Sequence, residues 1–147
     1  MTEIERLIES LARRGHDVER VEDGALYTQG ETHLALFALP APDGFVVRAH
    51  LDLDLYVDEE ALPDVLLGVN LLNAGLDFGS LILDPVESDD GDGDETVTFA
   101  VLGKTSLWLK DFSDAELSRL EHLLERFEAE VSGAVERSLS SGEHLKA

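Results

Sequence analysis

The chain has 147 residues, 44% of them hydrophobic and 29% charged, so it can fold as one globular domain with a real core. It holds 32 Asp and Glu against 11 Lys and Arg, and the formal charge of −21 argues against direct contact with nucleic acid or anionic membranes. The absence of cysteine excludes disulfides, thiol nucleophiles and thiolate metal sites. The N-terminal segment lacks the basic and apolar regions of a signal peptide, and the uncharged run at 65–76 is too short to cross a bilayer. We therefore expect a cytoplasmic protein.

The first elements are a helix and a meander of strands. Thr2 and Glu5 have the spacing of a capping box, and apolar residues at helical spacing follow until Gly15. Short extended segments come next at 18–21, 25–29 and 32–39. The segment Pro42-Asp43-Gly44 favours a turn, because proline presets φ and glycine accepts a positive φ. Residues 45–57 then alternate apolar and polar side chains, which predicts a long antiparallel strand.

The segment 62–73 predicts a helix that is apolar around nearly its whole circumference. Such a helix is buried on more than one side. In a chain of this size we expect the sheet on one side and another helix or a second subunit on the other. A homodimer with twofold symmetry is the commonest solution. The predicted dimer-interface residues are Val65, Leu66, Val69, Leu72 and Asn73.

The rest of the chain predicts strands at 79–83, 96–102 and 105–109, with an acidic loop at 86–95. Trp108, the only tryptophan, is expected in the core, since large aromatic residues are usually buried, and an exposed interaction site is the alternative. A second capping box, Ser113 with Glu116, opens a long helix. The predicted order is αβββαββ(β)α, an α+β class with an antiparallel sheet. We expect a single domain over residues 1–138 and a flexible tail over 139–147.

Acidic residues are concentrated in the middle of the chain. Residues 49–103 contain 14 acids and no Lys or Arg. A block of this kind carries a negative potential and suits a basic partner. We therefore predict a protein client, such as a basic DNA- or RNA-binding protein. The predicted client-binding acids are Asp52, Asp54, Asp89, Asp90, Asp92 and Asp94.

The same acids leave a second interpretation open. His50, Asp52 and Asp54 share one strand face, about 7 Å apart from one to the next, as divalent-cation ligands or an acid–base pair would require. A solvated sheet face is the favoured interpretation. The loop from Asp90 resembles an EF-hand but lacks its glycine and its final glutamate, which is Val101 here. The other histidines are scattered without ligand spacing and are expected at the surface. We therefore expect no metal site, no cofactor and no enzymatic activity.

Several segments of the chain resemble a known family. The run 66–83 (LLGVNLLNAGLDFGSLIL), the acidic hairpin after it, and residues 107–117 resemble the YbjN-like family, which is similar in fold to bacterial type III secretion chaperones. The resemblance covers residues 2–136. It implies an αβββαββα domain that forms a homodimer and binds protein clients without catalysis, as a chaperone or adaptor. The family also has a branch described as sensory or regulatory, and that role is the alternative.

Overall fold

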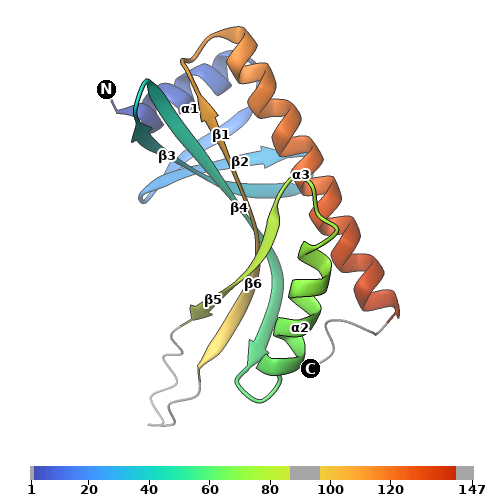
Figure 1. Cartoon of the computed structure of the whole chain (residues 1–147). Helices are drawn as coiled ribbons and strands as arrows, with labels where there is room; N and C mark the ends of the chain where they lie inside the picture. The colour runs from blue at the N-terminus through green and yellow to red at the C-terminus, as the bar shows by residue number, and fades with distance from the viewer. Residues whose placement is uncertain (1, 87–96, 142–147) are drawn as a thin grey trace. The chain divides into compact units, whose positions relative to one another are not determined.

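The computed structural model describes residues 2–86 and 97–141 (Figure 1). The predicted α+β class is confirmed, with three helices and an antiparallel sheet of six strands in the order β1-β2-β3-β4-β6-β5. In chain order the elements are α1 (Glu3–Arg13), β1 (Asp17–Val21), β2 (Gly24–Gln29), β3 (Thr32–Ala41), β4 (Gly44–Asp58), α2 (Leu62–Asn73), β5 (Ser80–Val86), β6 (Thr98–Leu109) and α3 (Asp114–Ser141).

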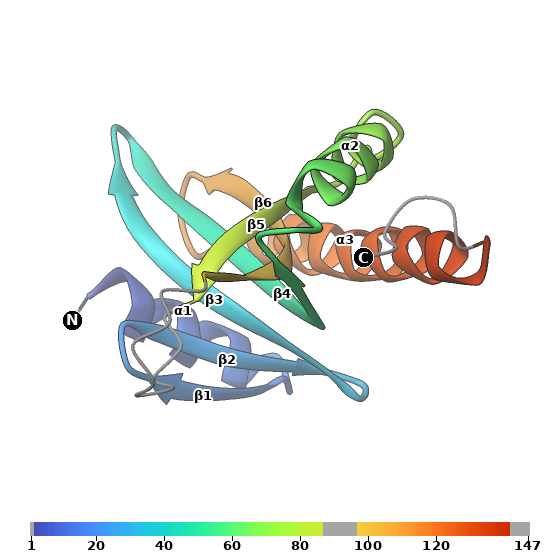
Figure 2. The same ribbon diagram turned by 90° about the horizontal axis from the view of Figure 1, so that it is seen from below.

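The chain divides into two compact units. Unit 1 comprises residues 1–51 and 104–128, and unit 2 comprises residues 52–103 and 129–147. Strands β4 and β6 and helix α3 therefore contribute residues to both units. In unit 1, α1 packs against β1, β2 and β3, and Figure 2 shows it lying along these strands. In unit 2, α2 packs against β5.

Helix α1 begins as the sequence predicts. The Thr2 hydroxyl accepts a hydrogen bond from the Glu5 amide at 3.3 Å, and the Glu5 carboxylate accepts one from the Thr2 amide at 3.4 Å. This reciprocal capping box satisfies two amides that the helix itself leaves free. The apolar stripe Ile4, Leu7 and Leu11 is buried. The predicted helix is thus confirmed, with one face in the core of unit 1.

Two aspartates make the tight connections of the meander. Asp23 and Asp43 adopt positive φ angles of 64° and 59°, and each precedes a glycine that opens the next strand. The positive φ therefore falls on Asp43 and not on Gly44, where the sequence places it. Aspartate is among the few residues that tolerate this conformation. Gly44 is needed for a different reason, because a Cβ there would lie 2.3 Å from the Leu109 carbonyl oxygen.

The strands along the chain differ from the prediction in two places. Four strands precede α2, whereas the predicted order counts three: the extended segment expected at 18–21 is a separate edge strand, Asp17–Val21, which pairs with β2. This strand is mostly exposed, so its sequence shows little apolar alternation. The strands predicted at 96–102 and 105–109 are one strand, β6, which continues through the buried Gly103. A glycine inside a strand weakens the pairing but does not by itself end it.

Helix α3 has the apolar face that its sequence predicts. Its buried apolar residues are Leu117, Leu120, Leu124, Phe127, Val131, Ala134 and Val135. The Ser113 hydroxyl accepts from the Glu116 amide at 3.4 Å, but the Glu116 carboxylate accepts from the Lys110 amide at 2.8 Å rather than returning to Ser113. The predicted second capping box is therefore only half formed. The helix runs to Ser141, three residues into the predicted tail, and residues 142–147 lie outside the described part of the chain.

Candidate functional site

Helix α2 exposes an apolar face. The side chains of Leu66, Leu67 and Leu71 are 50%, 61% and 53% exposed. Helical periodicity places them on one side of α2, within an arc of about 140°. Asn70, between them on that side, is exposed and uncharged. Exposed apolar side chains gathered in this way are typical of surfaces that contact a protein, a membrane or a ligand.

The opposite face of α2 is buried inside unit 2. Val65, Gly68 and Val69 are its buried residues, and the helix packs here against β5. The predicted burial on a second side is not supplied within the described chain, since the three leucines stay exposed. Of the predicted interface residues, Leu66 is exposed, whereas Val65 and Val69 belong to the core. The sequence could not tell the exposed Leu66 from the buried Val65 and Val69 because all three residues are apolar.

Two polar side chains hold the segment after α2. Asn73 donates a hydrogen bond to the Leu81 carbonyl at 3.1 Å and accepts one from the Leu81 amide at 2.6 Å. One Glu130 oxygen accepts hydrogen bonds from the amides of Asp77 and Phe78, at 2.9 and 2.8 Å. Asn73, predicted at the dimer interface, thus acts as a backbone partner for β5. Leu72 beside it is half-buried.

The predicted acidic strand face is only partly formed as expected. Asp52 and Asp54 are exposed, but Asp54 has a φ of 55° and its amide donates to the Asp52 carboxylate at 2.9 Å. The His50 ring packs on Phe37, with ring centroids 5.3 Å apart. Among residues 2–86 and 97–141, no three His, Asp or Glu side chains are grouped to hold a metal ion. The other predicted client-binding acids, Asp89, Asp90, Asp92 and Asp94, lie outside the described residues.

Trp108 does not lie in the core. Its side chain is 44% exposed, and its ring lies against Gly44, where two ring atoms would stand 3.0 Å from an added Cβ. Strand alternation explains the difference, because the neighbouring Leu109 is the residue that points into the core.

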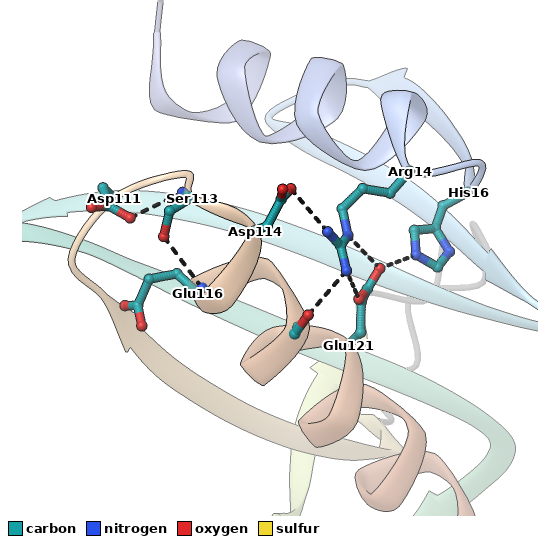
Figure 3. A network of polar contacts seen from close by, with 8 residues as sticks. Arg14, His16, Asp111, Ser113, Asp114, Glu116 and Glu121 are labelled. Atoms are coloured by element: carbon teal, nitrogen blue, oxygen red, sulfur yellow. Dashed lines mark hydrogen bonds and ion pairs between the residues drawn. The ribbon is translucent and has the colours of Figure 1, made fainter.

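Unit 1 contains a network of polar side chains that was not predicted from the sequence (Figure 3). The Arg14 guanidinium donates two hydrogen bonds to the Glu121 carboxylate, at 2.7 and 2.9 Å. It also donates to Asp114 at 3.1 Å and to Ser118 at 3.0 Å. On its other side, Glu121 bonds the Nε2 atom of His16. Arg14 follows α1 and the three other partners lie on α3, so the network joins two elements that are distant in sequence.

The network extends to a buried tyrosine. The Tyr27 hydroxyl lies 3.1 Å from Nδ1 of His16. Because a carboxylate only accepts hydrogen bonds, His16 donates to Glu121 from Nε2, and its Nδ1 atom is bonded to the Tyr27 hydroxyl. His16, expected at the surface, is therefore about three-quarters buried between β2 and α3.

The network displaces the pKa of two groups in opposite directions. Hydrogen bonds from the Arg14 guanidinium lower the pKa of Glu121 from its ordinary value of 4.5 to about 2. Burial raises the pKa of the Tyr27 hydroxyl, and the negative charges of Glu121 and Glu125 add to the effect. Both oxygens of Glu121 are occupied by Arg14 and His16, so this carboxylate is not available as a proton acceptor for a substrate. The geometry is that of a clamp between α1 and α3.

Within the described residues, no helix combines the length and the apolar character needed to cross a membrane.

No family model and no curated protein matches this chain. Among solved structures, it is similar to the crystal structure of YbjN from E. coli, a protein described provisionally as a transcription regulator. The two chains are 11% identical, and the match covers 99% of this chain and 97% of that one with a TM-score of 0.60. A likeness at this identity concerns the fold. The chain therefore has the YbjN-like α+β fold that its sequence resemblance predicts.

Proposed function

We propose that this protein is a non-enzymatic adaptor or chaperone that forms a homodimer through α2 and binds a protein client. The observation that carries the proposal is the exposure of Leu66, Leu67 and Leu71 on one side of α2, at whose edge the exposed Asp64 lies. Exposing three leucines to water is unfavourable, and a second copy of the same face would remove them from it. Two such faces related by a twofold axis are self-complementary.

The three leucines alone are too small to form a stable interface, so other residues must contribute to it. A standard interface buries about 800 Å² per partner, more than three half-exposed leucines provide. They therefore form the centre of the interface. Its rim is formed by exposed neighbours: Pro63, Asp64 and Asn70 on α2, and Ala74 just after the helix. The absence of charge between the three leucines matters, because two chains of −21 each repel one another wherever charged surfaces approach.

The dimer is tested by light scattering at micromolar concentration. Leu66→Asp places a charge at the proposed centre, and we expect a monomer with unchanged circular dichroism. The matched control is Leu39→Asp, which changes a leucine of similar exposure (40%) on β3 in unit 1 and should leave the dimer intact. A wild-type protein that is monomeric, or a dimer unaffected by Leu66→Asp, would contradict the proposal.

The client is proposed to be basic, such as a protein that itself binds DNA or RNA. Asp52 and Asp54 are exposed and lie in the block of 14 acids without a base. Complementary charge raises association rates, and the effect falls with salt. A surface this acidic disfavours direct contact with nucleic acid, so an influence on transcription would pass through a protein.

Affinity capture from the native cell, with the captured proteins identified by mass spectrometry, tests this step. Asp52→Asn with Asp54→Asn removes two charges, and asparagine tolerates the positive φ at position 54. The control Glu19→Gln with Glu22→Gln removes two exposed acids of unit 1. We expect the first pair alone to slow association with the purified client. If salt leaves that affinity unchanged, the contact is apolar and the client part of the proposal is wrong.

A sensory or regulatory domain is the second candidate. It is favoured by the likeness in fold to YbjN, which is described provisionally as a transcription regulator. The two candidates differ in the effect that binding has on the client: an adaptor keeps its client soluble or available, whereas a regulator changes the client's activity. Measuring DNA or RNA binding by the captured client with and without this protein separates them.

A further inference from the structure

Unit 1 contains a pocket that the proposed function does not use. It has a volume of about 650 Å³ and lies between α1, the beginning of β4 and the segment that joins β6 to α3. Small-molecule pockets typically enclose about 300–1,000 Å³, so this one has the size of a ligand site. All the residues that line it belong to unit 1.

One wall of the pocket is aromatic. Phe45 is buried and stacks on Phe112, with ring centroids 4.3 Å apart and planes inclined by 17°. The Arg6 guanidinium lies over the Phe112 ring, 5.7 Å from its centroid. The packing of Phe45 and the position of Arg6 hold Phe112, so the apolar wall is formed before any ligand binds. A preformed wall reduces the entropy lost on binding.

Three of the eleven cations of the chain line this pocket. They are Arg6, Arg13 and Lys110, in a protein whose formal charge is −21. Arg13 forms an ion pair with Glu9. Within the described parts of the chain, Arg6 and Lys110 form no ion pair closer than 4.0 Å, so both keep donors for a ligand. The neighbouring Asp111 accepts a hydrogen bond from the Ser113 amide at 2.9 Å.

From this combination we infer that the pocket binds a small aromatic monoanion, of which an aryl carboxylate is the simplest. The ring of the ligand packs along Phe45 and Phe112. Its carboxylate lies between Arg6, whose planar guanidinium suits a carboxylate, and Lys110. Ser10, which also lines the pocket, offers a hydroxyl. The inference is independent of the client and of the dimer, which involve unit 2.

The charge of the pocket selects a monoanion over a phosphate. Its three cations are balanced by Glu3, Glu9 and Asp111. A group with two or three negative charges would be attracted by the cations but repelled by the same number of carboxylates. A bare phosphate would also leave the aromatic wall unused. A single negative charge joined to an apolar ring uses both parts of the site.

The protein carries its own reporter for this pocket. Trp108, the only tryptophan, lies against Gly44, and Gly44 lines the pocket. Phenylacetate serves as the probe, with 2-phenylethanol as its neutral analogue and inorganic phosphate as an anion without a ring. Titrations follow Trp108 emission and the amide signals of Gly44 and Phe112. For a ligand of this size we expect a saturable 1:1 response with a dissociation constant on the order of 1 mM.

Paired variants test the role of the cations. Arg6→Gln with Lys110→Gln should weaken phenylacetate binding about tenfold, which is modest because both side chains are exposed. Arg20→Gln with Arg137→Gln makes the same change in net charge at exposed positions outside the pocket, and should alter binding by less than about twofold. 2-Phenylethanol should bind about tenfold more weakly than phenylacetate.

Three results would overturn the inference: no saturable change at Gly44 or Phe112 up to about 20 mM phenylacetate, equal weakening by both pairs of variants, or phosphate binding as tight as that of phenylacetate. A thermal melt of each variant confirms that it is folded. Because the dimer and the client are measured separately, failure here leaves the proposed function standing.

Discussion

The two units of the chain differ in net charge and in the partners of their carboxylates. Unit 1 contains 15 acids and 9 bases, a formal charge of −6, whereas unit 2 contains 17 acids and 2 bases, a formal charge of −15. In unit 1 some of the acids pair with bases, as in the bidentate pair of Glu121 with Arg14. In unit 2 the carboxylate of Glu130 instead accepts hydrogen bonds from backbone amides.

We infer from this difference that unit 1 stabilises the fold and that unit 2 provides the surfaces for recognition. Ion pairs and side-chain hydrogen bonds join α1 to α3 in unit 1. Unit 2 combines unbalanced charge with an uncharged leucine face on α2, and both features are unfavourable in an isolated monomer. Contact with a partner surface, as we propose, would relieve both. The proposed contacts with a second copy and with a client therefore both fall in unit 2.

The largest effect is expected from the two faces of α2. Val69→Asp places a charge among buried side chains of unit 2 and should lower the free energy of unfolding by about 4 kcal/mol or more. Leu66→Asp, three residues earlier, should remove only the stabilisation that dimerisation supplies, leaving the monomer folded. Urea unfolding followed by circular dichroism measures both. If the two variants unfold alike, the leucine face is not free and the proposed interface is wrong.

The clamp of unit 1 should give a smaller effect. Glu121→Gln removes the charge that holds Arg14 and His16, and we expect a loss of about 1–2 kcal/mol in the free energy of unfolding. The loss is limited because both Arg14 and Glu121 retain about a quarter of their contact with water. The matched control, Glu136→Gln, changes an exposed acid on the same helix and should cost less than about 0.5 kcal/mol.

The contrast between the units also explains what the sequence could predict. Helix α1, the long strand β4 and the buried stripe of α3 follow from local patterns: a capping box, alternation and helical spacing. The clamp does not, because Arg14 and Glu121 are 107 positions apart and no spacing rule joins them. For α2 the local pattern was ambiguous, since an apolar circumference does not say which side the sheet covers. The exposure of Trp108 depended on the register of β6.

The pH dependence of stability gives a finer test of the clamp. The pKa of Glu121 is about 2 in the folded protein and near 4.5 when unfolded, so the unfolded chain takes up the proton first as the pH falls. The stabilisation by Glu121 is thus complete above about pH 4.5 and is lost as the pH falls toward 2. The difference between wild type and Glu121→Gln should shrink over this range and vanish near its lower end. A difference that stays constant down to pH 2 would show that the two chains differ by packing and not by charge.

The smallest effect, a few-fold change in affinity, is also the one that best separates the two proposed contacts of unit 2. Raising the salt from about 0.05 to 0.5 M shortens the screening length to a few ångströms. Repulsion between two units of −15 then weakens, so the homodimer, with its uncharged centre on α2, should tighten. The contact with a basic client should loosen over the same range, because screening removes an attraction. Light scattering follows the first equilibrium and a binding titration the second, with Leu66→Asp as the chain that stays monomeric throughout. A dimer that dissociates as salt is added must be held by ion pairs. The interface would then lie on charged residues away from the leucine face, and α2 would be left for another partner.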